Sequence, residues 1–121
     1  MYRIPLVADP QPEEMELFHT FQGFLIPDSL VFGESGQLYV SLAGPLPSIA
    51  VLDTDGEQVA LLQGPAGSAI PFDAPATMVF DDARKSLLVA NHAIFGDPAH
   101  FAILRVYVGE RGDDQPAPGL D

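Results

Sequence analysis

The sequence predicts an all-β protein, and three observations lead to this class. Twelve prolines and eleven glycines recur along the 121 residues, and they separate short segments that are rich in β-branched and aromatic residues. No segment holds apolar residues at helical spacing for more than two turns. The chain also contains an internal repeat, in which PDSLVF at 27–32 and GQLYVS at 36–41 are echoed by PATMVF at 75–80 and KSLLVA at 85–90.

The length of the repeat narrows the expected architecture. Pro27 and Pro75 stand 48 residues apart. Units of roughly 40–50 residues that are built from short strands and turns are typical of β-propeller blades. We therefore expect a partial β-propeller, in which about two and a half antiparallel four-stranded blades follow one another along the chain.

The expected strands divide into three groups that make up one unit over residues 1–112. Strands at 2–7 and 16–21 form a half blade within 2–21, and the acidic turn between them, with Glu13, Glu14 and Glu16, is interpreted as a solvated loop. A complete blade within 26–64 contains strands at 28–32, 37–42, 48–53 and 57–62. The last blade, within 72–108, contains strands at 76–80, 86–91 and 101–108.

The turns between these strands have recognisable chemistry. Segments 34–36 (ESG) and 53–56 (DTDG) end in glycine, which supplies the positive φ that tight hairpin turns need. Segment 81–84 (DDAR) is expected to turn in the same way, and a long connection over 91–100 precedes the last strand. From Gly109 onward the chain combines acidic residues, proline and glycine, so we expect a disordered tail, with 113–121 outside the folded unit.

Composition limits the partners. Five basic against seventeen acidic residues give a formal charge of −12, which repels nucleic acid and anionic membrane surfaces. The sequence has no cysteine, so a disulfide framework and a thiolate zinc site are excluded.

No apolar run approaches the ~20 residues of a spanning helix, and no signal peptide is recognisable. We expect a soluble chain, and its open strand edges predict self-association.

The segments IPDSLVF at 26–32, SGQLYV at 35–40 and IAVLDTDG at 49–56 resemble late blades of the gluconolactonase and senescence marker protein (regucalcin) family. The segment LLVANHAIFGDP at 87–98 is similar to the last blade of bacterial members. That family consists of six-bladed propellers with NHL-like blades. Ser29 stands where the family prefers glycine. Bacterial relatives are often exported, so an extracytoplasmic parent protein is one expectation, and the localisation stays open.

The resemblance implies a calcium or zinc ion on the propeller axis, held by a Glu, an Asn and the Asp of a Pro-Asp-Gly turn. Only that Asp has a counterpart in this chain, at Asp28, so the metal is expected only in a complete propeller. Asp28 is the candidate metal ligand and catalytic carboxylate. The alternative is that Asp28 is simply good turn chemistry at a strand start.

Asn91 and His92 are the candidate substrate-binding residues, because they open the long connection that could bend over a pocket. The alternative is that Asn91 caps a turn while His92 packs beside Phe95. His19 and His100 lack metal-ligand spacing and are interpreted as surface or packing residues. The glycine-rich segment 64–68 (GPAGS) matches neither a phosphate loop nor a nucleophile elbow.

Two functions follow as hypotheses. The first is part of a metal-dependent hydrolase that opens a sugar lactone or a similar cyclic ester, as the resemblance implies; residues 1–121 alone are expected to be inactive. The second is a propeller scaffold without turnover, which binds a small ligand or a protein at one end. A second catalytic group is missing from these residues, which keeps the scaffold hypothesis open.

Overall fold

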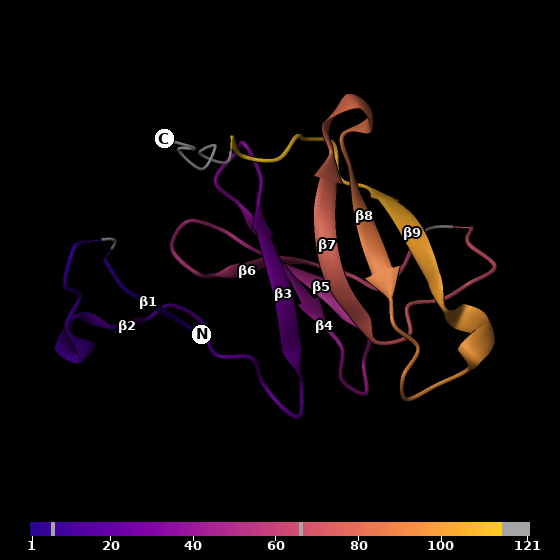
Figure 1. The fold of residues 1–121 in the computed structure, drawn as a ribbon, viewed down its shortest axis with the longest axis horizontal. Helices are drawn as coiled ribbons and strands as arrows, with labels where there is room; N and C mark the ends of the chain where they lie inside the picture. Colours follow the sequence, from indigo (N-terminus) through magenta and orange to yellow (C-terminus); the bar gives the residue numbers. More distant parts are fainter. Residues whose placement is uncertain (6, 66, 115–121) are drawn as a thin grey trace.

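The computed structural model describes residues 1–5, 7–65 and 67–114, and they form three antiparallel sheets (Figure 1). The first sheet pairs β1 (Tyr2–Arg3) with β2 (Glu16–Leu17). The second has the order β3 (Pro27–Phe32), β4 (Leu38–Leu42), β5 (Ser48–Leu52) and β6 (Gln58–Leu62). The third has the order β7 (Pro75–Asp81), β8 (Ser86–Asn91) and β9 (Ala102–Tyr107).

The all-β prediction is confirmed for the described residues. Their only helical turns are three short 3-10 segments, η1 (Pro12–Glu14), η2 (Asp82–Arg84) and η3 (Pro98–His100). None of the three sheets closes into a barrel. Within the described ranges no helix is both long and apolar enough to cross a membrane.

The first two strands are much shorter than expected. The ladder contains only two pairs, Tyr2 with Leu17 and Arg3 with Glu16, where strands at 2–7 and 16–21 were predicted. Pro5 has no N–H to donate to a ladder, so it ends the first strand early. After Leu17 the chain leaves the pairing, and Phe18 and Phe21 pack against the middle sheet instead. Leu6 lies outside the described residues.

The sequence repeat has a matching repeat in the hairpins. In β3 and β4 the register shifts between Pro27 and Leu30, and in β7 and β8 it shifts between Pro75 and Met78. Both first strands therefore carry a bulge at the same place in the repeat. The second turn is one residue longer, because Phe32 pairs with Leu38 whereas Phe80 pairs with Leu87.

The turn residues agree with this alignment of the repeats. Gly36 has φ +82° and Lys85, at the corresponding place before β8, has φ +49°. Both turns therefore need a residue with a left-handed backbone conformation. Lys85 adopts this conformation in the second turn at some conformational cost. The expected turn at 81–84 is present, as the 3-10 segment η2 followed by Lys85.

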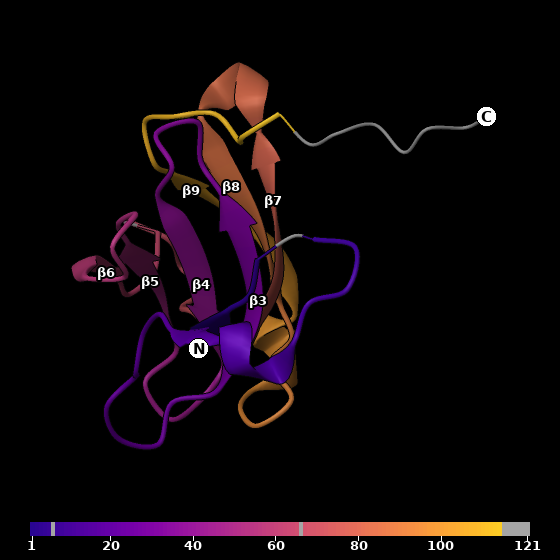
Figure 2. The same ribbon diagram turned by 90° about the vertical axis from the view of Figure 1, so that its left-hand side faces the viewer.

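The middle sheet is buried on both faces, which explains why β4 and β5 have no exposed residue. One face carries Tyr39, Ile49 and Val51 and shares a core with the last sheet. The opposite face carries Leu38, Val40, Leu42, Ala50 and Leu52, and residues of the N-terminal segment cover it. The middle and last sheets thus pack face to face (Figures 1 and 2), whereas the exposed β1–β2 ladder lies to one side of them.

The first strands of the two larger sheets lie side by side and point in the same direction (Figures 1 and 2). The Ser41 hydroxyl on β4 donates to the Ala76 carbonyl oxygen on β7 over 2.6 Å, so one hydrogen bond joins the two sheets directly. Residues 109–114, which we expected to begin a disordered tail, return to the β3–β4 turn, where Gly112 bridges to Gly33. The predicted tail residues 115–121 lie outside the described residues.

Candidate functional site

One end of the two larger sheets gathers the residues predicted to bind ligand. Pro27 pairs with Leu42 and Pro75 pairs with Asn91, so the starts of β3 and β7 lie beside the ends of β4 and β8. Because β3 and β7 point the same way, both starts lie at the same end of the molecule (Figure 1). We call this the Asp28 end. It also contains the β4–β5 turn over 43–47 and the β8–β9 connection over 92–101.

Asp28 is exposed at the second position of β3, inside the bulge. Its carboxylate forms no hydrogen bond or salt bridge with any residue that the structure describes. In the second repeat the same place in the bulge belongs to Ala76. The backbone conformation of this bulge therefore does not require an acidic side chain.

Asn91 is 1% exposed and holds the connections of the Asp28 end together. Its Oδ1 accepts a hydrogen bond from the Asp73 amide over 2.7 Å. Its Nδ2 donates to the carbonyl oxygens of Pro71 and His100 over 3.0 and 2.8 Å. Both amide hydrogens are thereby used, so in this structure Asn91 positions the segments on either side of β7 and β8.

His92 lies next to Asn91 but is exposed. Its ring meets Phe101 edge to face, with 6.4 Å between the ring centroids, where packing beside Phe95 was the expected alternative. The His92 amide donates to the Ala74 carbonyl oxygen over 3.0 Å. His92 is therefore an exposed residue of the Asp28 end, in the connection that follows the last sheet's β8, whereas Asp28 belongs to the middle sheet.

Sequence reasoning missed a carboxylate–imidazole pair in the same region. His100 Nδ1 lies 2.9 Å from Asp73 Oδ2, and that oxygen also accepts a hydrogen bond from the Asp97 amide over 3.0 Å. A Cβ at Gly96 would stand 2.0 Å from Asp73 Oδ2, so any larger residue at position 96 would displace the Asp73 carboxylate. The two partners are 27 residues apart, and no spacing rule connects them.

An apolar groove of about 260 Å³ opens at the Asp28 end. It is lined by residues that come from the segment before β3, the β4–β5 turn and the β8–β9 connection, namely Phe24, Ile26, Gly44, Pro45 and Phe95. The two phenylalanine side chains are 81% and 76% exposed. The groove therefore offers aromatic and aliphatic surface close to the end that carries Asp28 and His92.

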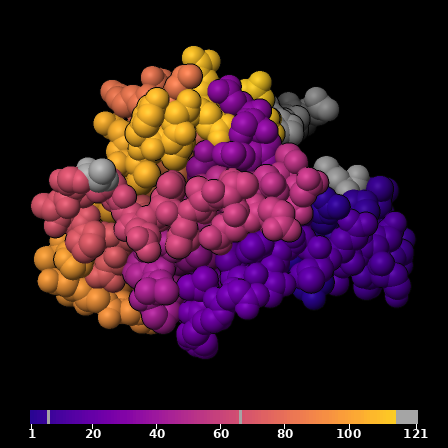
Figure 3. All heavy atoms as spheres, turned by 180° about the vertical axis from the view of Figure 1, so that it is seen from behind, coloured from indigo at the N-terminus to yellow at the C-terminus, as the bar shows by residue number. Residues whose placement is uncertain are grey.

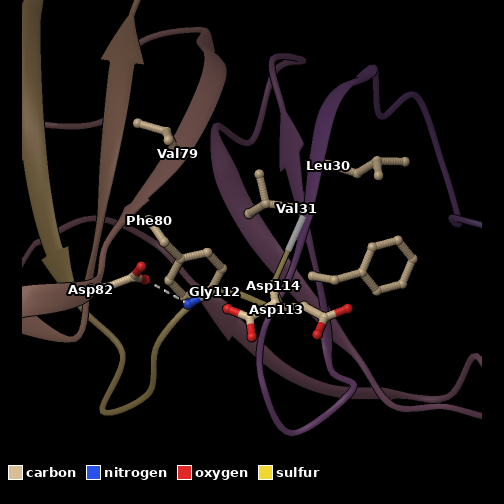
Figure 4. Close-up of a pocket in the computed structure, with 9 residues that line it drawn as sticks. Leu30, Val31, Val79, Phe80, Asp82, Gly112, Asp113 and Asp114 are labelled. Carbon is tan, nitrogen blue, oxygen red and sulfur yellow. Dashed lines mark hydrogen bonds between the residues drawn. The ribbon is translucent and has the colours of Figure 1, made fainter. Parts of the chain in front are cut away.

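A second hollow of about 460 Å³ lies at the opposite end of β3 and β7 (Figure 4). Apolar side chains, among them Val31 and Phe80, form its walls, and Asp82, Asp113 and Asp114 add carboxylates. One of these is engaged, because Asp82 Oδ1 accepts a hydrogen bond from the Gly112 amide over 2.9 Å. This hollow lies away from Asn91 and His92.

The C-terminal segment is fastened near that hollow by Glu110. The Tyr39 hydroxyl donates to Glu110 Oε1 over 2.6 Å, and the Ser35 amide donates to Oε2 over 2.9 Å. Burial alone would raise the pKa of Glu110, but the hydrogen bonds from Tyr39 and Ser35 outweigh it and lower the pKa below 4.5. Burial raises the pKa of Tyr39 well above its ordinary value, and the carboxylate adds to this rise.

The described residues do not by themselves assemble a metal site. No three His, Asp or Glu side chains within residues 1–5, 7–65 and 67–114 converge as metal ligands. Asp28 contributes one carboxylate, whereas calcium takes six to eight oxygen ligands and zinc takes four ligands. Among the described residues, Asp28 would therefore need ligands from elsewhere to hold a divalent cation.

The fold and this end define a class: an all-β protein of stacked antiparallel repeat sheets, with a carboxylate and an apolar groove at one end. Comparisons with protein-family models, with curated proteins and with solved structures found no match. The resemblance to gluconolactonase-like propellers stays a prediction.

Proposed function

We propose that the chain belongs to a β-propeller-type array and that the Asp28 end binds a small ligand. The repeated bulged hairpins and the face-to-face stacking of the sheets support the array. The groove that Phe24 and Phe95 flank would supply apolar contact to the ligand. Asp28 does not line this groove but stands two residues after Ile26, which does, and would supply the polar contact at its edge. This combination of apolar wall and few polar groups is typical of small-molecule sites.

The observation that carries the proposal is the state of Asp28. It is exposed, it has no polar partner among the described residues, and alanine takes its place in the equivalent bulge. A carboxylate that the fold does not use is available to a ligand. It can accept a hydrogen bond from a hydroxyl group, or it can accept the proton of a water molecule that attacks an ester.

The reaction we propose for a complete array is hydrolysis of a cyclic ester, the class that the family resemblance implies. Asp28 would then serve as the proton acceptor or as one of several ligands to a cation. The remaining ligands would have to come from residues outside 1–121, because this chain supplies only one. Binding without turnover is the alternative.

The test compares two aspartates on the same sheet. Hydrolysis of a sugar δ-lactone is followed by acid release, with Ca²⁺ or Zn²⁺ added, in the longest natural protein that carries this chain. Asp28→Asn is expected to lower kcat about 10²-fold or more, as loss of a proton acceptor or metal ligand does. Asp55→Asn is the matched control, because Asp55 is also exposed but lies in the β5–β6 turn at the opposite end.

The outcomes separate the hypotheses. Equal turnover by the Asp28→Asn variant and the unchanged protein would remove Asp28 from the site. If no lactone is hydrolysed, binding of the same lactone is measured by NMR shifts of amides at 26–30 and 92–96. Shifts that Asp28→Asn abolishes support the scaffold alternative, whereas no shifts would contradict the proposal that this end binds such a ligand.

A further inference from the structure

The two repeats place equivalent residues in opposite environments. Ile49 pairs with Ser41 in the middle sheet, and Ile103 pairs with Ala90 at the corresponding place in the last sheet. Ile49 is 0% exposed, whereas Ile103 is 69% exposed. Val79, the counterpart of Val31, is 57% exposed, although Val31 is half-buried. Equivalent faces of the two sheets are therefore covered in the middle sheet and exposed in the last sheet.

The chain itself shows what covers this face. In the middle sheet the residues Tyr39, Ile49 and Val51 pack against the last sheet, which presents its own opposite face to them. That opposite face carries Met78, Leu87 and Val89. A sheet of this repeat therefore packs one face onto the other face of the next sheet. The partner that fits the bare face on β7–β9 is consequently another sheet of the same repeat.

The reciprocal face is also partly open at the other end of the stack. Leu30 and Phe32 on β3 are 48% and 45% exposed. Their counterparts in the second repeat are covered, since Met78 is 4% exposed and Phe80 is half-buried. The N-terminal segment shields β4 and β5 on this face but leaves these two side chains open. Each chain thus displays one bare face and, on β3, the part of the reciprocal face that the N-terminal segment leaves open.

For residues 1–121 in solution, we propose that the face of the β7–β9 sheet with Val79, Leu88 and Ile103 is a docking surface for a second copy of this chain, which takes the place that a further sheet has in the proposed array. The docking is head to tail, and the second copy contributes the Leu30 and Phe32 side of its middle sheet. The exposure of Val79 (57%) and Ile103 (69%) identifies the face on β7–β9. It points away from the side shown in Figure 3, where the pink atoms of β6 lie across the middle of the molecule and the yellow atoms of the C-terminal part lie above them. A contact between two different faces can continue from copy to copy, so assemblies larger than dimers follow.

The net charge of the chain predicts how the association depends on salt. Each copy carries a formal charge of −12, so copies repel one another at low ionic strength. The docking residues Val79, Leu88 and Ile103 are apolar. The charged side chain of Arg105, which pairs with Leu88 on this face, lies 3.7 Å from Asp81 of its own sheet, so the attraction does not need opposite charges on the second copy. Raising the salt concentration screens the repulsion and is expected to strengthen the association. Association through ion pairs would respond in the opposite way.

The test is sedimentation velocity of residues 1–121 over a wide concentration range at low and high salt. We expect the sedimentation coefficient to rise with protein concentration, and to rise further with salt. The double variant Val79→Thr with Ile103→Thr is expected to weaken the association about tenfold or more. Leu30→Thr is expected to weaken it as well, because it alters the reciprocal face. Val59→Thr on β6 is the control, because Val59 is 53% exposed but lies on another strand.

NMR of the unchanged chain gives a second readout that requires no variant. Amide signals of β3, β7 and β9 are expected to shift or broaden as the concentration rises, while those of β6 remain constant. A chain that stays monomeric at every concentration and salt would overturn the proposal. Association that the Val79→Thr and Ile103→Thr double variant leaves intact, or that Val59→Thr reduces equally, would overturn it too.

Discussion

The equivalent isoleucines of the two repeats allow one substitution to be compared in two environments. Ile49→Ala and Ile103→Ala remove the same atoms from the third strand of a sheet, at the corresponding register position. The side chain of Ile49 lies between the middle sheet and the last sheet, whereas that of Ile103 points away from this core. Any difference in stability therefore reports on the stacking of the sheets.

The expected magnitudes differ widely. Ile49 is 0% exposed, and truncation of a buried isoleucine to alanine costs about 2–5 kcal/mol, because burial is lost and a cavity remains. Ile103 is 69% exposed, and substitutions at exposed positions usually stay within about 0.5 kcal/mol. For a domain whose total stability is about 5–15 kcal/mol, only the first loss is large.

Urea unfolding followed by far-UV circular dichroism measures both variants, since the chain has no tryptophan. The protein concentration is kept low, so that docking of a second copy does not protect Ile103. We expect a clearly lower midpoint for Ile49→Ala, an unchanged slope with denaturant, and almost no effect of Ile103→Ala. Equal losses at both positions would refute the stacking that distinguishes the two faces.

Two further predictions concern single polar groups. Because the pKa of Glu110 is lowered in the folded chain, its carboxylate stabilises the fold above pH 4.5, and this stability is lost as the pH falls through the lowered pKa. Acid titration of the unfolding free energy should show this loss in the unchanged chain and a smaller one in Glu110→Gln; identical acid profiles would contradict the assignment. Asn91→Ala removes three partly buried hydrogen bonds, to the Asp73 amide and to the Pro71 and His100 carbonyl oxygens, and each such bond contributes about 0.5–1.5 kcal/mol. Hydrogen exchange should then accelerate over residues 92–101, and unchanged protection there would contradict the positioning role of Asn91.

The arrangement of strands within the repeats could be predicted from the sequence because local rules agree with one another there. Apolar segments of five or six residues alternate with turns, and Gly36 marks one turn that needs a left-handed residue. The internal repeat strengthened this prediction, because the same weak pattern of strands and turns occurs twice in the sequence. The fully buried strands β4 and β5 show continuous apolar runs, as strands covered on both faces do.

The N-terminal hairpin and the Asp28 end were less predictable. The length of β1 and β2 depends on how residues 1–25 meet the middle sheet, and that contact is long-range. Asn91 was found from its place after a strand, but its burial and its bonds to Pro71 and His100 depend on two separate connections. The Asp73–His100 pair has no sequence signal because its members are brought together only by the fold.

A crystal structure of residues 1–121 tests the central claim, that repeated bulged hairpins stack face to face, most directly. We predict bulges at 28–29 and 76–77, Ile49 enclosed between two sheets, and Asp28 and His92 at one end. Val79 and Ile103 should face a second copy or solvent. Hairpins of different shape over 27–42 and 75–91, or an Ile49 side chain that the last sheet does not cover, would contradict the account.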